Sequence, residues 1–482
     1  MLTAIEKLRQ DALAIWQAGV DAVTPNQLFR NKVFMDGTHL CVEDVAIDLS
    51  DIDRIVVVGA GKASASMAIA LHHVLLDKLP GSLRGLPVSG WINAPAETFT
   101  QQQADELEPI HVHVARPAGL NWPTEAAVLG TQRILQQVRQ ATERDLVICL
   151  LSGGGSALLV APRQGVTLAD KQAVAREIAA AGGNIVQLNT VRRALSEVKG
   201  GGLARACGAR QMLTLIISDV LGDPLEIIAS GPTLQQESYS AQPAREALDQ
   251  LGLRNSSNLA NVVRCLEQRI AAEKNAAIET NISTCASAPS RCHVEHVILG
   301  NNADAIDAAG VKAVELGYRY VMQGAKRSEG DVHQVAQSAA AAIEQLTCQD
   351  IASPDLVDCW ISGGEPTVTL PTVGAGKGGR NQQLALAVLH ELQSRGKLYS
   401  KLTPRPMVFV SGGTDGEDGP TDAAGAWIDS QSSLRATSIG LEAEDFLRRA
   451  DAYHFFERVG GLLLTGPTGT NVCDLRVALI GK

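Results

Sequence analysis

A lysine and an arginine each stand at a glycine turn that leads into a helix pattern, and both residue types bind phosphate. Lys62 follows an apolar run in RIVVVGAGKAS (54–64), and Arg380 with Asn381 ends the glycine run of GAGKGGRNQQLALA (374–387). Such turns expose backbone N–H groups, and the positive end of the following helix attracts anions. Lysine adds a point charge and arginine a bidentate fork. The two segments therefore predict sites for an anionic ligand.

The first of these turns matches neither of the common phosphate loops. In the P-loop pattern, G-x-x-x-x-G-K-[ST], Val56 replaces the first glycine and Ala63 the last residue. In the dinucleotide pattern, G-x-G-x-x-G/A, Gly59 and Gly61 fit, but Ser64 occupies the third position. The turn therefore predicts phosphate binding through these two glycines outside both standard motifs.

Two further glycine-containing segments carry candidate anion ligands. SGGGSALL (152–159) follows an apolar run, and its glycines let backbone N–H groups approach an oxyanion closely. The candidates there are Ser152, Gly153, Gly154, Gly155 and Ser156. NTVRRALSEVKGGGLA (189–204) adds Asn189, Arg192 and Lys199 near another glycine run. Arg192 and Lys199 are about two helical turns apart and so share a face. For the SGGG segment, a tight turn without a ligand is the alternative.

Two acidic segments could hold Mg²⁺ or accept a proton. One is SDVLGDPLEIIASGPT (218–233), and the other is SGGTDGEDGPTDAAGAWID (411–429). Their carboxylates are Asp219, Asp223, Glu226, Asp415, Glu417, Asp418 and Asp422. Carboxylates after strands are common magnesium or general-base positions, and the spacing of a calcium loop is absent. A helix cap for Asp219 and solvated turns for the others are the alternatives. The histidines have no metal-ligand spacing.

These residues must be positioned by the apolar runs that precede them. Seven runs end abruptly in glycine or polar residues: 54–62, 145–156, 212–219, 296–302, 356–365, 406–416 and 461–471. Continuous apolar runs of this length predict strands buried on both faces, hence mostly parallel sheets. Alanine-rich helix patterns lie between them, for example 63–76, 169–181 and 332–346. The fold class is therefore α/β. In such sheets the carboxyl ends of the strands carry the functional loops, and turns that belong to one sheet should meet at one edge.

Bulk properties limit the classes of function. The 482 residues predict two or three domains, and the stretch 275–295 has the composition of a linker. A net charge of −10 argues against a nucleic-acid partner. Nine scattered cysteines without a CxxC pair fit a reducing compartment. We find neither a signal peptide nor a membrane-spanning run and expect a cytoplasmic protein without a membrane partner. Monomer and homodimer both stay open.

At this point the chain resembles the glycerate 2-kinases, a two-domain family once described as hydroxypyruvate reductases. The matching blocks, in order along about residues 5–478, are VVVGAGKAS, LLSGGGSALL, NTVRRALSEVKGGGLA, IISDVLGDPLEIIASGPT, ISGGEPTVTL with GGRNQQLALA, SGGTDGEDGPTDAAGAWID and TGPTGTNVCDL. The resemblance implies ATP-dependent phosphorylation of D-glycerate to 2-phosphoglycerate, with Mg²⁺. It also implies that Lys62 and Arg380 form the catalytic pair.

The resemblance implies the domain organisation as well. We expect a Rossmann-like three-layer domain over 1–285 with a mostly parallel sheet. A smaller α/β domain with a mixed sheet should follow over 286–482, with the active site in the cleft between them. Packing of the last strand or helix onto the first domain stays open.

Combining the residues with the resemblance gives a mechanism to test. Lys62 and Arg380 would neutralise the transferred phosphoryl group, because phosphoryl transfer needs charge and in-line positioning more than covalent help. Asp415 and Asp418 are the expected metal ligands. Asp219 would accept the proton of the substrate hydroxyl, or bind metal instead. The SGGG amides, with Arg192, would hold the substrate carboxylate.

Two departures from the family leave other readings open. The family's His-Pro-x-Pro-Asp segment reads ARPAGLNWPTEA (115–126), with Arg116 near the place of the histidine. An expected GEA turn reads GAKRSEGD (324–331). A kinase for a related small hydroxy acid is therefore one alternative. An NAD(P)H-dependent hydroxypyruvate reductase is another, although the second-strand candidate LRGLPVSG (83–90) ends without the ribose-binding acid. A non-catalytic anion-binding protein is the third.

Overall fold

The computed structural model describes residues 3–117, 122–235, 240–280, 292–350, 352–353, 355–396 and 405–481. Contacts between Cα atoms divide the chain into two compact units. The N-terminal unit comprises Phe29–Ile216 and Asp223–Leu299, and the C-terminal unit comprises Met1–Leu28, Ile217–Gly222 and Gly300–Lys482. None of the helices in the described ranges is long and apolar enough to cross a membrane.

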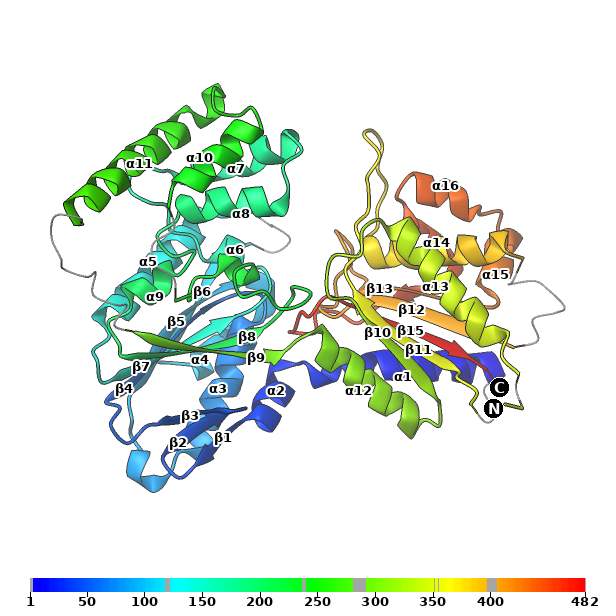
Figure 1. Cartoon of the computed structure of the whole chain (residues 1–482). Helices are drawn as coiled ribbons and strands as arrows, with labels where there is room; N and C mark the ends of the chain where they lie inside the picture. Colours follow the sequence, from blue (N-terminus) through cyan, green and yellow to red (C-terminus); the bar gives the residue numbers. More distant parts are fainter. Residues whose placement is uncertain are drawn as a thin grey trace. The chain divides into compact units, whose positions relative to one another are not determined.

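A six-stranded sheet forms the centre of the N-terminal unit (Figure 1). Its strands are β4 (Arg54–Ala60), β5 (Val88–Pro95), β6 (Ile110–Arg116), β7 (Asp145–Leu151), β8 (Gln211–Ile217) and β9 (His293–Gly300). They lie in the order β6-β5-β4-β7-β8-β9, and the pairings from β6 to β8 are parallel. This is the strand order 3-2-1-4-5-6 of Rossmann sheets, in which ligands bind where the order reverses. Here the reversal falls between β4 and β7.

The apolar sequences of β4 and β7 explain their central place. Every residue of β7 is buried, as is every residue of β4 after Arg54. A strand buried on both faces needs a helix layer on each side. The helices α3 (Ser64–Lys78) and α5 (Glu125–Gln140) supply these layers, because they pack on strands of this sheet and lie on opposite sides of it (Figure 1).

A separate group of helices packs around its own apolar core in the N-terminal unit. These helices are α7 (Leu168–Ala180), α8 (Ile185–Ala194), α10 (Gln242–Gln250) and α11 (Ala260–Thr280). Thr167 and Asn184 begin α7 and α8 with capping boxes. The apolar faces of α7 and α8 include Val174 and Val191, which are buried in this core. The cap and the core together fix the two helices that carry Lys171 and Arg192.

The remaining elements of this part of the chain are short. An antiparallel sheet of β1, β2 and β3, which the sequence did not lead us to expect, precedes β4. The bounds are α2 (Pro25–Lys32), β1 (Val33–Asp36), β2 (His39–Val42), β3 (Val45–Asp48), η1 (Gly81–Leu83), η2 (Ala96–Thr98), α4 (Gln101–Glu106), α6 (Gly155–Leu158), α9 (Gly202–Ala206), η3 (Ile228–Ser230) and η4 (Ser257–Leu259).

The C-terminal unit contains a mixed six-stranded sheet in the order β10-β11-β15-β12-β13-β14. Its strands are β10 (Tyr320–Gly324), β11 (Cys359–Gly364), β12 (Met407–Gly413), β13 (Gly425–Asp429), β14 (Leu462–Leu463) and β15 (Asp474–Ile480). β15 is antiparallel to both of its neighbours, β11 and β12. The carboxyl ends of β11 and β12 therefore lie at the same edge as Asp474, the first residue of β15.

Helices cover both faces of this sheet. On one face, α1 (Ala4–Ala22) and α12 (Asn302–Glu315) share a core with β11, β12 and β15, and the Nε1–H of Trp16 donates to the Leu475 carbonyl over 3.1 Å. On the other face, a second group of helices packs around its own apolar core. They are α13 (Val332–Thr347), α14 (Arg380–Ser394), α15 (Ser432–Ser438), α16 (Ala443–Arg448) and α17 (Ala452–Val459).

The structure confirms the predicted fold class and corrects one detail of the prediction. The seven apolar runs supply strands to two sheets, and the second sheet is mixed, as expected. The second strand of the Rossmann sheet runs beyond 83–90, to Pro95, and Glu97 stands two residues after its end. The domain division at 285/286 stays a prediction, because its boundary lies outside the described residues; contacts group the segment Met1–Leu28 with the C-terminal unit.

Candidate active site

The turn that follows β4 and the turn that follows β7 are joined by hydrogen bonds. The backbone N–H of Lys62 donates to the Gly153 carbonyl over 2.8 Å, and the N–H of Ala63 donates to the hydroxyl of Ser152 over 2.9 Å. A Cβ atom on Gly61 would lie 2.7 Å from the Ser152 carbonyl oxygen, so only glycine permits this approach. The GAGK and SGGG segments therefore form one assembly at the point where the strand order reverses.

Within this assembly the predicted glycines and serines divide into supporting and accessible residues. Gly59 is buried in β4, where a Cβ atom would lie 3.0 Å from that of Leu150. Ser152 and Gly153 are also buried and bond the neighbouring turn. Gly154 is exposed, has φ +76°, and a Cβ atom on it would lie 3.6 Å from Cγ of Lys62. Gly154 is thus the part of the loop that a ligand beside Lys62 can reach.

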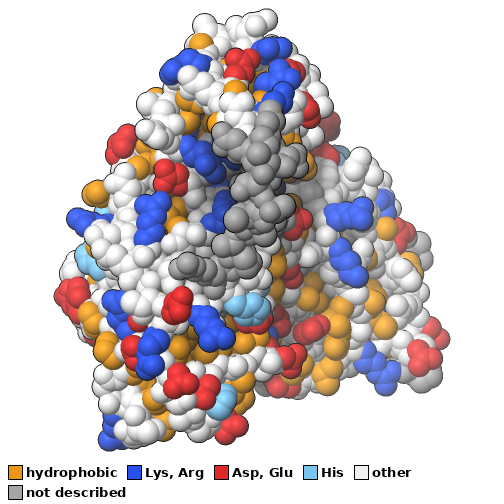
Figure 2. Space-filling model, turned by 60° about the vertical axis from the view of Figure 1, so that its left-hand side comes forward, with side chains coloured by type: hydrophobic (Ala, Val, Ile, Leu, Met, Phe, Trp, Pro, Cys, Tyr) orange, Lys and Arg blue, Asp and Glu red, His pale blue; other side chains and the backbone are white. Residues whose placement is uncertain are grey.

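A cavity of about 440 Å³ opens beside Gly154 and Ser156. Its other lining residues are Arg116, Trp122, Pro123, Ala157, Val160, Lys171, Gln172, Ala175, Arg192 and Lys199. Four of these are cations and none of the described lining residues is an acid. We call this site the cationic cavity. On the face that Figure 2 shows, by contrast, Lys, Arg, Asp and Glu side chains are interspersed.

Burial weakens the proton affinity of Lys171, Arg192 and Lys199 in this cavity. Desolvation, followed by the charges of Arg192 and Arg163, lowers the pKa of Lys171 to about 7. Desolvation, followed by the charges of Lys171 and Arg192, holds the pKa of the buried Lys199 well below its usual range. Burial also lowers the pKa of Arg192. An anion in the cavity would relieve this repulsion, so the site favours a negatively charged ligand.

Lys199 is oriented by a strained segment that follows β8. Its Nζ donates to the Ser156 carbonyl over 2.9 Å and lies 3.3 Å from the Ser230 hydroxyl, which also bonds the Ser156 hydroxyl at 2.9 Å. Ala229 and Ser230 have φ values of 49° and 64°. Non-glycine residues rarely adopt this left-handed region, and the strain concentrates at functional sites. The IASG sequence therefore supports the cavity through its serine.

Two other predicted residues of this region have different places. Arg116, in the segment that departs from the family pattern, ends β6, is buried and lines the cationic cavity. Residues 118–121 of the same segment lie outside the described residues. Asn189 is buried in α8, one turn before Arg192, and is not among the residues that line the cavity.

In the C-terminal unit, Arg380 begins α14 and is held by two carboxylates. Its Nε and Nη2 donate to the two oxygens of Asp474 over 2.8 and 2.9 Å, and its Nη1 donates to Glu365 over 2.9 Å. Burial lowers the pKa of Arg380, but the charge and hydrogen bonds of Asp474 outweigh burial and raise it overall. We call Arg380, Glu365, Asp415 and Asp474 the Arg380 cluster. Its cation is fixed and compensated.

Asp418 and Asn381, predicted as metal and phosphate ligands, face this cluster from within the protein. The two carboxylate oxygens of Asp418 accept the backbone N–H groups of Asn381 and Gln382 over 3.0 and 2.8 Å, which caps α14. The Asn381 side chain bonds Asp474 and Ser411. Asp418 is 2% exposed and Asn381 1%, so the structure uses both to hold Arg380 and its helix in place.

Other carboxylates in this region are better suited to a metal ion. Burial raises the pKa of Cys473, and the charges of Glu365, Asp474 and Asp219 raise it further, so these acids gather around one point. Burial likewise raises the pKa of Glu365, to which Asp415 contributes. Asp219, Glu365 and Asp415 are each only partly buried. In the described part of the chain, no group of three or more His, Cys, Asp or Glu side chains is arranged to hold a metal by itself.

The sequence analysis missed four residues of these two sites. Glu365 and Asp474 stand directly after glycine-containing segments, ISGG and TGPTGTNVC, so their position after a turn was a usable signal. Ser230 could have been suspected from its neighbour Gly231 in the IASGP segment. Lys171 lies in an ordinary amphipathic helix pattern, and nothing in the sequence distinguishes it from a surface lysine.

Comparisons with known proteins cover almost the whole chain. A family model described as a domain of unknown function, DUF4147, matches residues 11–267, and the MOFRL family model matches residues 358–474. The glycerate kinase of Rattus norvegicus is 37% identical over 99% of this chain and 94% of its own length. The D-glycerate 2-kinase of Thermotoga maritima is 30% identical over 98% and 99%. A crystal structure of the Thermotoga maritima glycerate kinase superposes with a TM-score of 0.76 at 30% identity, over 98% of this chain and 100% of the other.

Proposed function

The chain belongs to the glycerate kinase family, and from this premise we propose that it transfers the γ-phosphoryl group of ATP to the 2-hydroxyl of D-glycerate. The observation that carries the proposal beyond family membership is the cationic cavity. Lys171, Arg192 and Lys199 converge there with a glycine loop, and none of the described lining residues is an acid. A small hydroxy acid supplies the carboxylate that such a cavity lacks.

In the N-terminal unit, Arg192 and the Gly154 loop would bind the substrate carboxylate. An arginine binds a carboxylate through two parallel hydrogen bonds, which fixes the orientation of a small molecule. Lys199, oriented by Ser156 and Ser230, adds a second charge. Lys62, whose side chain lies beside Gly154, is then close to the rest of the substrate, and we assign to it the charge that stabilises the transferred phosphoryl group.

In the C-terminal unit, Arg380 would meet the same phosphoryl group from the nucleotide side. Two of its five N–H groups, one on each terminal nitrogen, are not used by Glu365 or Asp474. The carboxylates hold the guanidinium in one orientation, so little freedom is lost when it binds. Because Lys62 and Arg380 lie in different units, the reaction requires both units to engage the same pair of substrates.

Mg²⁺ fits this scheme as an ion that arrives with the nucleotide. Magnesium usually takes one or two protein carboxylates and completes its shell with phosphate oxygens and water, and it neutralises charge on the phosphates. Asp415 and Asp219 would hold it, because they are partly exposed. Asp418 instead caps α14 with both oxygens. If Asp415 alone binds the metal, Asp219 remains to accept the proton of the 2-hydroxyl.

The direct test is an ATP-coupled assay of D-glycerate, L-glycerate, glycolate, tartronate and tartrate, with phosphorus NMR to locate the new ester. We expect turnover of D-glycerate with the ester on the 2-position, and loss of turnover when EDTA removes divalent ions. Absence of turnover of every acid in the presence of Mg²⁺ would refute the kinase proposal. Oxidation of NADH or NADPH by hydroxypyruvate would support the reductase alternative instead.

A second substrate class is favoured by one residue. Arg116 is buried in the cavity wall, at the place where the family pattern has a histidine. Arginine in place of histidine changes the size and the charge of this wall, so a hydroxy dicarboxylate such as tartronate is the alternative substrate. Turnover of tartronate well above that of D-glycerate, with the preference lost in Arg116→Ala, would support this alternative.

A further inference from the structure

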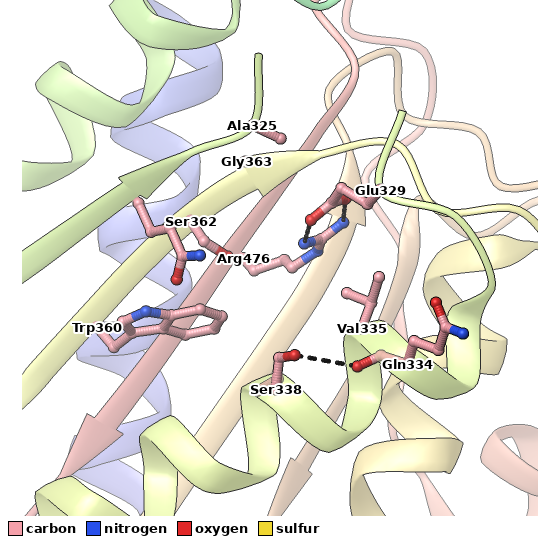
Figure 3. A pocket seen from close by; sticks show the side chains of 11 residues that line it. Ala325, Glu329, Gln334, Val335, Ser338, Trp360, Ser362, Gly363 and Arg476 are labelled. Carbon is pink, nitrogen blue, oxygen red and sulfur yellow. Dashed lines mark hydrogen bonds and ion pairs between the residues drawn. The ribbon is translucent and has the colours of Figure 1, made fainter. Parts of the chain in front are cut away.

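A second cavity, of about 360 Å³, lies in the C-terminal unit on the sheet face that α13 covers (Figure 3). Its lining residues are Gln323, Ala325, Glu329, Gln334, Val335, Ser338, Ala339, Trp360, Ser362, Gly363 and Arg476. We call it the Trp360 cavity. Its size is within the range of about 300–1,000 Å³ that small-molecule sites occupy.

Two residues that line this cavity carry buried polar atoms without a hydrogen-bond partner in the described residues. They are the hydroxyl oxygen of Ser362 and Nε of Arg476, whose residues are 3% and 1% exposed. An unsatisfied buried polar group costs about 1–3 kcal/mol, and such groups in native proteins call for an explanation. A ligand that accepts a hydrogen bond from Nε–H and bonds the hydroxyl supplies one.

The charge of the wall argues against an anionic ligand. The terminal nitrogens of Arg476 bond both oxygens of Glu329 over 2.9 and 2.6 Å (Figure 3). This pair is neutral overall, in contrast to the cationic cavity. A ligand of this site is therefore expected to be uncharged in the part that enters it.

The remaining walls combine apolar surface with amide groups. Trp360, on β11, and Val335 and Ala339, on α13, are the buried apolar residues. Gln323 and Gln334 are exposed and add side-chain amides, each of which can donate and accept. A planar heteroaromatic ring with acceptor nitrogens and an amino group matches this combination. Adenine is such a ring.

The cavity lies beside the Arg380 cluster on the same sheet. Arg476 and Asp474 are two residues apart on β15, so their side chains share a face and stand about 7 Å apart along the strand. Asp474 holds Arg380. On the adjacent strand, Gly363 lines the cavity, and Glu365, two residues later, also bonds Arg380. A ligand that fills the cavity can therefore extend directly to the Arg380 cluster.

We propose that the Trp360 cavity binds the adenine ring of ATP and so places the triphosphate beside Arg380. This inference rests on the proposed kinase function and adds the position of the nucleotide base. The ring would accept from Nε–H of Arg476, bond the Ser362 hydroxyl, and lie between Trp360 and the α13 residues.

The test compares ligands with and without the base. Ser338 is exposed on α13 and lines the cavity, so Ser338→Phe should block it from the mouth without altering the core. By isothermal titration in Mg²⁺ buffer, we expect this variant to weaken ATP binding at least tenfold and to leave inorganic tripolyphosphate within twofold of the wild type. The KM for D-glycerate should not change. Gln337→Phe, at the preceding exposed position that does not line the cavity, is the matched control.

A second variant keeps the proposal testable if Ser338→Phe folds poorly. Ser362→Ala removes an unsatisfied hydroxyl, so it should leave the melting temperature equal or higher while weakening ATP binding several-fold. Unchanged ATP affinity in both variants, or equal weakening of ATP and tripolyphosphate, would overturn the base site and leave the kinase proposal standing. Failure of the wild-type protein to bind or use ATP would overturn both.

Discussion

The cationic cavity and the Arg380 cluster both contain buried or half-buried cations, but the two regions differ in how these charges are balanced. In the cavity, Lys171, Arg192 and Lys199 stand together, no acid is among the described lining residues, and burial lowers the pKa of each. In the cluster, Arg380 is bound by Asp474 and Glu365, and its pKa is raised. The cationic cavity therefore holds positive charge that none of its described lining residues balances. In the Arg380 cluster, by contrast, the cation is paired with carboxylates and fixed in orientation.

This difference indicates a division of labour. Uncompensated cations bind a small anion strongly because the ligand supplies the missing charge, which suits ground-state binding of a carboxylate. A compensated arginine gains less from the ground state, but it is oriented in advance for charge that develops during transfer. Lys62 lies beside Gly154, which lines the cationic cavity. The following changes test this comparison, from the largest expected effect to the smallest.

Lys62→Ala should produce the largest loss, of about 10²-fold or more in kcat, because it removes a charge aimed at the transferred group. The KM for D-glycerate should change less, since the carboxylate is held by other residues. Steady-state kinetics on the folded variant checks this. Lys312→Ala, on the surface of α12, is the control. A kcat near the wild-type value would remove Lys62 from the mechanism.

Asp474→Ala should lower the free energy of unfolding by about 2 kcal/mol, because the substitution leaves the half-buried Arg380 without its main partner. Asp53 is the matched control. It bonds Nε and Nη2 of Arg144 over 2.8 Å in the same bidentate geometry, but both side chains are more than half exposed. Removing such an exposed partner should cost much less, because water screens the pair. Chemical denaturation of both variants measures the contrast, and equal losses would contradict the claim that the Arg380 cluster is a compensated, buried pair.

Arg192→Ala should raise the KM for the hydroxy acid about tenfold with a smaller effect on kcat, because a bidentate carboxylate contact is lost from the ground state. The KM of Arg192→Lys should lie between those of the wild type and Arg192→Ala, since lysine keeps the positive charge but cannot form two parallel hydrogen bonds. Arg193→Ala is the neighbouring control, because Arg193 bonds the Glu226 carbonyl and does not line the cavity. A fall in kcat without a change in KM would place Arg192 in the chemical step instead.

Lys171→Met should have the smallest effect of these substitutions, and it should raise the free energy of unfolding, whereas Asp474→Ala lowers it. Its folded pKa, about 7, is below the unfolded value of about 10.4, so the charged lysine destabilises the protein fully below pH 7. This penalty fades as the pH rises from 7 to the unfolded pKa. The variant should therefore be about 1 kcal/mol more stable at pH 7, and this gain should shrink by pH 9.

The pKa of Lys171 also leads us to expect that substrate binding depends on pH. An anion binds better to the protonated form, so the KM of the wild type for D-glycerate should rise as the pH increases through about 7. In Lys171→Met this rise should be weaker. Melting temperatures and KM values between pH 6 and 9 test both effects. A variant that is less stable than the wild type at every pH would show that Lys171 is compensated after all.

Much of the fold followed from local pattern. Continuous apolar runs such as 54–60 and 145–151 can be buried only as central strands, and the alanine-rich segments between them only as covering helices, so the α/β class was predictable. The turn residues Lys62 and Gly154 were predictable for the same reason, since a glycine turn between strand and helix is itself a local feature. The small sheet β1–β3 was not predicted, because short strands of mixed polarity carry little periodic signal.

The amino-acid sequence by itself determined which segments become strands, which turns carry glycine, and which cations stand at those turns. Only the tertiary structure decided which of these residues act together. Arg380 meets Asp474 across 94 positions of the chain, and Lys199 meets Ser230 across 31. The pKa of Lys171 and the unsatisfied atoms of the Trp360 cavity likewise exist only after burial. The physical reason is that backbone preference is a local property, whereas desolvation and charge pairing depend on neighbours that folding brings together.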